Sequence, residues 1–124
     1  MEGHLSQPIN EALGCVQGKC TSSDHYKVYV NPSLVNLDES HLGYWIGPIC
    51  VSTTAVADDI YLQTEVPSNL QHLMNMASKS GKQYRIIYGA TKTKIVVTGS
   101  KIDMEYYRET SPWTMDGALS LIHI

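Results

Sequence analysis

Apolar residues recur at regular intervals along this chain, and the intervals predict both helices and strands. The clearest helix follows Val66-Pro67-Ser68-Asn69, because leucine, methionine and alanine then recur at the i, i+3, i+4, i+7 spacing of a half-buried helix, at Leu70, Leu73, Met74 and Ala77. Gly81 is predicted to close this helix as its C-terminal cap, since glycine readily adopts the left-handed conformation that such caps use.

An earlier helix is predicted to begin at the polar cluster Thr21-Ser22-Ser23-Asp24, whose side chains can accept hydrogen bonds from the unpaired N–H groups of a first turn. The apolar positions that follow have helical spacing, at Tyr26, Tyr29, Val30, Leu34 and Leu37. Pro32 falls inside this pattern. Because proline lacks a backbone donor and clashes with the preceding turn, it is expected to kink the helix or to divide it in two.

Runs of aromatic and β-branched residues predict the strands. Residues 44–51 are predicted to form an irregular strand interrupted by Gly47-Pro48, and the next apolar stretch forms a short hairpin with Asp58-Asp59 at its tip. Further elements are expected as strands at residues 84–87, 92–98 and 113–115, as a helical turn at 103–108 and as a hairpin at 3–13. Paired strands that alternate with single helices predict the α+β class, in which helices pack on one face of an antiparallel sheet.

Composition and charge limit the class of protein. The chain has 124 residues, which suggests one domain or part of one, and its formal net charge is −3. An acidic balance disfavours a stand-alone nucleic-acid binder, which normally carries a basic surface. It does not exclude a catalytic subdomain whose basic surfaces lie elsewhere. Positive charge gathers in the second half of the chain, at Lys79, Lys82, Arg85, Lys92, Lys94 and Lys101.

The cellular compartment can also be inferred. The three cysteines, Cys15, Cys20 and Cys50, are an odd and low number, which argues against a disulfide scaffold and for a reducing, intracellular compartment. No apolar run approaches the ~20 residues that a membrane-spanning helix needs, so no membrane is expected among the partners. The lysines are too dispersed along the chain to distinguish cytoplasm from nucleus.

Asp58 and Asp59 carry the strongest chemical signal in the chain. Two carboxylates held side by side on a tight turn repel one another, and a divalent cation between them would relieve that repulsion. Hard cations such as Mg²⁺ or Mn²⁺ prefer carboxylate oxygens. The same pair is also typical of an ordinary solvated turn. The pair alone therefore leaves two interpretations open: a metal site, or a solvated turn of an α+β domain.

Three motifs in a fixed order extend this signal. Val16-Gln17-Gly18 precedes the first predicted helix, Val56-Ala57-Asp58-Asp59 lies in the hairpin, and Lys92-Thr93 follows the second helix. Their order and the elements between them resemble the palm of a reverse transcriptase, with the closest likeness to the polymerases of non-long-terminal-repeat retrotransposons. The resemblance extends over residues 3–115.

The resemblance divides the chain into three parts. Residues 1–110 match a partial palm, and residues 111–117 match the start of a thumb. Residues 118–124 lie outside the resemblance and look like translated adaptor sequence or a change of reading frame. The fingers, which cradle the incoming nucleotide in this family, would precede residue 1.

The resemblance implies an RNA-directed DNA polymerase that uses two Mg²⁺ or Mn²⁺ ions for nucleotidyl transfer. Asp58 matches a direct metal ligand, and Asp59 matches a more peripheral acid. Gln17 matches a polar residue beside the incoming nucleotide, and Gly18 lets the backbone approach template or primer closely. Lys92 matches a lysine near the triphosphate. The implied partners are an RNA template, a DNA primer and nucleoside triphosphates.

The family also needs another metal-binding aspartate, on a strand before the Gln-Gly motif. The only acids before that motif are Glu2 and Glu11, and neither lies in the apolar strand context that the family shows. The chain is therefore expected to be catalytically incomplete and inactive alone. The alternative function is a non-catalytic module that binds nucleic acid or protein. Palm surfaces that lack their covering are also expected to self-associate.

Overall fold

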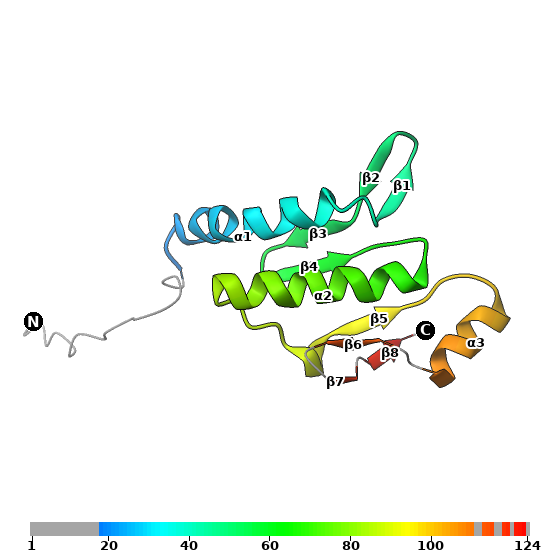
Figure 1. Cartoon of the computed structure of the whole chain (residues 1–124). Coiled ribbons are helices and arrows are strands. Elements are labelled where there is room, and N and C mark those ends of the chain that lie inside the picture. Colours follow the sequence, from blue (N-terminus) through cyan, green and yellow to red (C-terminus); the bar gives the residue numbers. More distant parts are fainter. Residues whose placement is uncertain (1–17, 111–112, 116–117, 120, 124) are drawn as a thin grey trace, which may run out of the picture.

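The structure, a computed structural model, describes residues 18–110, 113–115, 118–119 and 121–123 (Figure 1). The hairpin predicted at residues 3–13 lies outside these residues. The described elements are, in order, α1 Ser22–Asp38, β1 Tyr44–Ile46, β2 Ile49–Val51, β3 Thr53–Val56, β4 Asp59–Leu62, α2 Pro67–Tyr84, the 3-10 helix η1 Ala90–Lys92, β5 Lys94–Val96, α3 Lys101–Thr110, β6 Thr114–Met115, β7 Ala118–Leu119 and β8 Leu121–His123.

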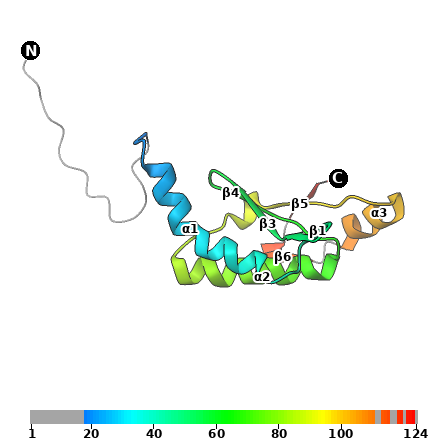
Figure 2. The same cartoon turned by 90° about the horizontal axis from the view of Figure 1, so that it is seen from above.

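The described strands pair in four two-stranded sheets. Neighbouring strands form the antiparallel pairs β1–β2, β3–β4 and β6–β7, whereas β5–β8 is parallel. Helices α1 and α2 lie side by side on one face of the β3–β4 pair (Figures 1 and 2). The predicted α+β class is therefore confirmed, with strands that form separate pairs in place of one continuous sheet. Strands β7 and β8 come from the segment after residue 117, so this segment takes part in the strand pairing.

Helix α1 runs unbroken through Pro32. Figure 2 shows its axis bending between the blue and the cyan part of the helix. Of the two outcomes predicted for Pro32, the kink is the one that occurs. The helix stays in one piece because its buried face continues on both sides of the proline, with Val30 before it and Ser33 and Leu37 after it.

Residues 44–51, predicted as one irregular strand, form a hairpin instead. Strands β1 and β2 are antiparallel, with Tyr44 opposite Val51 and Ile46 opposite Ile49. Gly47 has a φ of 59°, a conformation that a residue without Cβ adopts at little cost, so the chain reverses there. The prediction was wrong because glycine and proline between two apolar runs are also the pattern of a turn.

Helix α2 confirms the start and the apolar face predicted from the sequence. It begins at Pro67, and its buried positions include Leu73 and Met74. Helix α1 contacts the other end of α2, where the hydroxyl of Tyr29 donates a hydrogen bond to the carbonyl oxygen of Tyr84. The two tyrosine rings meet edge to face, with 6.4 Å between their centroids. The pair therefore joins the two helices at the C-terminal end of α2.

Gly81 does not end α2 as predicted. The helix runs on beyond it, and Arg85 takes the left-handed cap conformation with a φ of 55°. A Cβ at Gly81 would lie 2.8 Å from the carbonyl oxygen of Ile86 and 2.8 Å from the ring of Tyr88. Glycine is needed because the chain folds back over the last turn of the helix. This return path replaces the strand predicted at residues 84–87.

The predictions for the C-terminal third are partly confirmed. The strand predicted at residues 92–98 is shortened to β5, because the chain first forms η1. The helical turn predicted at 103–108 is the full helix α3, which Ser100 caps: its Oγ accepts from the Asp103 N–H at 3.2 Å and donates to Asp103 Oδ2 at 2.6 Å. The strand predicted at 113–115 is β6.

Two clusters of buried side chains form the core, one joining α2 to the C-terminal strands and one joining α1 to α2. Leu62 of β4 and Tyr88 pack against both clusters. The buried members are Met74, Ile95, Trp113 and Met115 in the first cluster and Leu37, Leu73 and Ala77 in the second. None of the described helices combines the length and the apolarity needed to cross a membrane.

Candidate functional site

The β3–β4 hairpin closes with a two-residue loop that contains Asp58. Val56 and Asp59 pair across the hairpin, which leaves Ala57 and Asp58 as the turn. Ala57 has a φ of 54°, a conformation that residues with a side chain adopt rarely. The predicted hairpin is therefore confirmed, but its tip lies one residue earlier than predicted, since Asp58 is in the turn and Asp59 is the first residue of β4. We refer to Asp58 and Asp59 together as the acidic turn.

Both side chains of the acidic turn are exposed. Within the described part of the chain, neither carboxylate forms an ion pair, and no group of three or more Asp, Glu, His or Cys side chains could hold a metal ion. Mg²⁺ keeps several of its waters where few carboxylates are available. The acidic turn therefore exposes two carboxylates that are adjacent in sequence, and no third possible ligand among the described residues joins them.

Tyr26 of α1 is a neighbour of the acidic turn that sequence reasoning did not assign to the site. Burial raises the pKa of its phenol, and the negative charges of Asp58, of Tyr88 once it is ionised, and of Asp59 raise this pKa further. The acidic turn thus lies near the N-terminal half of α1. In the sequence Tyr26 was only one apolar position of a helix, and nothing local could signal this proximity.

The interior beside Tyr26 contains hydroxyl groups. Burial raises the pKa of the Tyr88 phenol, and the hydroxyl of Ser33 on α1 lies beside it. The two hydroxyls do not reach hydrogen-bond geometry, and the Thr53 hydroxyl of β3 is likewise buried without a hydrogen-bond partner among the described residues. Buried hydroxyls usually make at least one hydrogen bond. The packing between α1 and the hairpin is therefore polar in part, not a closed apolar core.

Asp38, the last residue of α1, fixes the start of the hairpin that bears the acidic turn. Its Oδ1 accepts hydrogen bonds from the backbone N–H groups of Ser52 and Thr53, both at 3.0 Å. Both residues are buried, so water competes little for these donors. The bonds are also strengthened by the charge of the carboxylate. No local signal in the sequence pointed to this role of Asp38, because its partners lie 14 and 15 residues away.

Of the remaining predicted site residues, Gly18 and Lys92 lie within the described part of the chain, and neither is joined to the acidic turn by a hydrogen bond or an ion pair there. Gly18 has a φ of 85°, and no described atom lies within 4 Å of a Cβ added at this position. Glycine is therefore favoured here by the backbone conformation and not by a close contact. Lys92 ends η1 with an exposed side chain and forms no ion pair with any described acid. Gln17 lies outside the described residues. The structure therefore keeps Asp58 and Asp59 together and leaves Lys92 solvated.

Comparison with known proteins supplies no relative for this site. No protein-family model, no curated protein and no solved structure matches the chain.

Proposed function

We propose that this chain is part of the palm of an RNA-directed DNA polymerase of the non-long-terminal-repeat retrotransposon type. The observation that carries the proposal is the acidic turn, with one exposed carboxylate in the turn of a tight hairpin and the next at the start of β4, on a hairpin that packs on two helices. The order of helix, acidic hairpin, helix and Lys92-Thr93 supports the same proposal. The intact enzyme would extend a DNA primer on an RNA template with nucleoside triphosphates.

The acidic turn suits a hard divalent cation such as Mg²⁺ or Mn²⁺. Its carboxylates are exposed and adjacent, and no cation of the described chain competes for them. Asp58 would be the direct ligand and Asp59 the more peripheral acid. In a two-metal site, the bound ions stabilise the attacking and leaving oxygens of nucleotidyl transfer. The protein's part is to hold the two carboxylates on a hairpin anchored by Asp38.

Three further residues would contact the substrates. Gln17 would border the incoming nucleotide, and Gly18 would allow template or primer to approach the backbone. Lys92 has an exposed ammonium group that could pair with a phosphate of the nucleotide. Lys92 and its neighbour Lys94 would also be exposed on a simple solvated surface, so these lysines support the proposal less than the acidic turn does.

Titration with Mg²⁺, followed by NMR of the backbone amides, tests the proposed metal site. We expect saturable shifts at Asp58 and Asp59 with a Kd of about 1–10 mM, because two carboxylates supply few ligands. Traces of Mn²⁺ should broaden the same amide signals. The Asp58→Asn variant should weaken binding by about tenfold, which corresponds to ~1.4 kcal/mol.

The control for this titration is Glu105→Gln, which removes one exposed carboxylate of α3 and changes the net charge equally. This variant should bind Mg²⁺ as the parent chain does. The proposal would be wrong if the amides of the acidic turn responded to neither ion, or if Asp58→Asn left the affinity for Mg²⁺ unchanged. Either result would indicate a plain solvated turn.

The chain is not expected to polymerise on its own. Among the described residues, no third carboxylate joins Asp58 and Asp59, so the two-ion site that positions both reacting oxygens would be incomplete. A primer-extension assay with an RNA template, a DNA primer and either Mg²⁺ or Mn²⁺ should therefore give no template-directed product. Synthesis by this chain that Asp58→Asn abolishes would overturn the incomplete-site hypothesis while strengthening the family assignment.

A further inference from the structure

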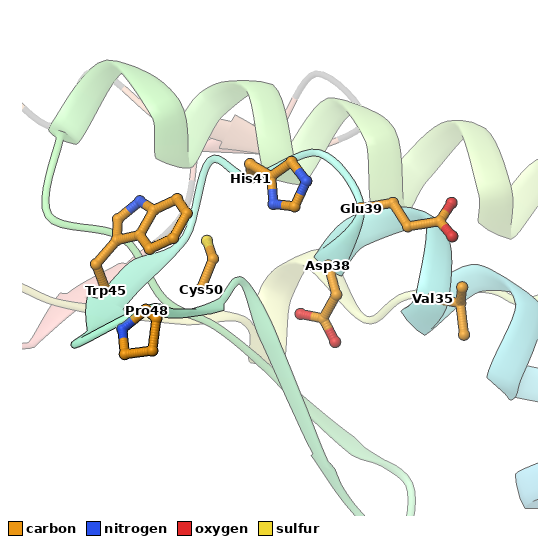
Figure 3. Close-up of a pocket in the computed structure, with 7 residues that line it drawn as sticks. All are labelled: Val35, Asp38, Glu39, His41, Trp45, Pro48 and Cys50. Carbon is orange, nitrogen blue, oxygen red and sulfur yellow. The ribbon is translucent and has the colours of Figure 1, made fainter.

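An open cleft lies between the C-terminal end of α1 and the β1–β2 hairpin, away from the acidic turn. Its volume is about 340 Å³. Figure 3 shows Trp45 and Pro48 on one side, Asp38 and Glu39 on the other, and the ring of His41 between them. The volume lies near the lower end of the range for ligand sites, about 300–1,000 Å³, and suits a single side chain or a small molecule.

One wall of the cleft is negatively charged. Asp38 and Glu39 stand at the C-terminal end of α1, where the helix dipole already adds negative potential, and the last turn of α1 contains no basic residue. Asp38 uses Oδ1 for the backbone of the hairpin, and its Oδ2 accepts no hydrogen bond from any described residue. No lysine or arginine of the described chain forms an ion pair with either acid. A cation placed here would relieve an unfavourable arrangement of charge.

The opposite wall is aromatic. The Trp45 side chain remains 46% exposed, although tryptophan usually buries most of its surface. The ring of His41 lies nearly parallel to it, with centroids 6.2 Å apart and 25° between the planes. The backbone N–H of Trp45 donates to Glu65 Oε1 at 3.3 Å, which ties β1 to the segment before α2. The cleft thus presents an accessible π surface opposite carboxylates.

We propose that this cleft binds a guanidinium group, in the form of an arginine side chain from a partner peptide. A planar cation can stack on Trp45 within about 6 Å of the ring centroid, while its N–H groups point toward Asp38 Oδ2 and the Glu39 carboxylate. The Glu39 side chain extends away from Trp45 in Figure 3, and because it is exposed it can rotate toward the ligand. Lysine fits less well, because its compact ammonium cannot stack or present a planar fork of donors.

Titration with Nα-acetyl-L-arginine amide, which carries only the guanidinium charge, tests the proposal directly. We expect saturable NMR shifts of the Trp45 indole N–H and of the His41 and Cys50 amides, with a Kd of about 1–10 mM. The buried Trp113 indole serves as an internal reference and should not move. The citrulline analogue, which has the same shape without the charge, should give no saturable shift. Added salt should weaken arginine binding.

Two variants each change one wall of the cleft, and a third serves as their control. Trp45→Leu removes the π surface and should weaken binding by about tenfold. Glu39 is exposed, and Glu39→Gln leaves the hydrogen bonds between Asp38 and the hairpin intact. This variant should weaken arginine binding by about threefold. Glu109→Gln on α3 makes the same charge change elsewhere and should leave the affinity unchanged. If Trp45→Leu does not fold, Glu39→Gln measured against Glu109→Gln decides the question.

Two results would overturn the proposal. One is an equal response to the arginine and citrulline compounds, which would indicate apolar binding without charge recognition. The other is an affinity that Glu39→Gln and Glu109→Gln leave equally unchanged. The experiment does not involve the acidic turn, so its failure and the failure of the polymerase proposal are distinguishable.

Discussion

Replacing Gly43 by alanine is expected to lower the free energy of unfolding by about 3 kcal/mol or more, which is the upper range for overpacking by a methyl group. Gly43 is buried between α1 and β1, and an added Cβ would lie 2.3 Å from the Val51 carbonyl oxygen and 2.5 Å from the Ser52 Cα. Both are backbone atoms of the segment that links β2 to β3. The clash can therefore be relieved only by moving that segment, since no side chain can rotate out of the way.

Urea unfolding of Gly43→Ala, followed by circular dichroism, measures this loss. The natural control is Gly89→Ala, because the nearest side-chain atom to its added Cβ is Lys92 Cβ at an ordinary contact distance of 3.6 Å. This control should change stability by less than about 0.5 kcal/mol. A Gly43→Ala variant with the parent midpoint would show that the segment between β2 and β3 can adopt another path.

The second large effect is expected at Asp38. Asp38→Ala removes the acceptor of two buried backbone N–H groups, those of Ser52 and Thr53, and leaves both donors unpaired. Each unpaired buried donor costs about 1–3 kcal/mol, so we expect a total loss of about 2–6 kcal/mol. Asp38→Asn keeps the acceptor oxygen and loses only its charge, so its effect should be about half as large.

Hydrogen exchange gives the local measurement for Asp38. The amides of Ser52 and Thr53 should lose protection in Asp38→Ala more than the amides within α2, because the anchor of the hairpin is lost first. The matched control is Asp24→Asn, whose carboxylate forms an exposed ion pair with Lys27 and should contribute less than about 1 kcal/mol. Unchanged protection at Ser52 and Thr53 would contradict the proposed anchor.

The elements that the sequence predicted well are those with a strong local pattern. Helix α2 has apolar residues on one face over several turns, and the β3–β4 hairpin lies where two apolar runs flank an acidic pair. The errors occur where a residue serves a contact distant in sequence. Gly81 was predicted to be a C-terminal cap because glycine is common at such caps. In the structure, glycine is needed at this position because the chain folds back over the helix and brings the ring of Tyr88 close to it.

In the candidate site, too, local patterns were predicted well and contacts distant in sequence were not. The hairpin that carries Asp58 in its turn followed from the local pattern, although Asp59 proved to belong to β4. The nearby phenol of Tyr26 and the anchoring carboxylate of Asp38 did not, because each depends on how α1 packs against the hairpin. The cleft at Trp45 was also beyond local reasoning, since an aromatic residue in an apolar run reads as a core position until its exposure is known.

Leu62 and Tyr88, which pack against both core clusters, link the two halves of the molecule energetically. Since each cluster loses part of its packing when the other opens, the clusters should unfold as one cooperative unit. Leu62 ends the strand that begins with Asp59, so the acidic turn is only one short strand away from this shared contact. Substitutions deep in the C-terminal cluster, such as at Ile95, would thus reach the geometry of Asp58 and Asp59 by loosening β4, without touching either carboxylate.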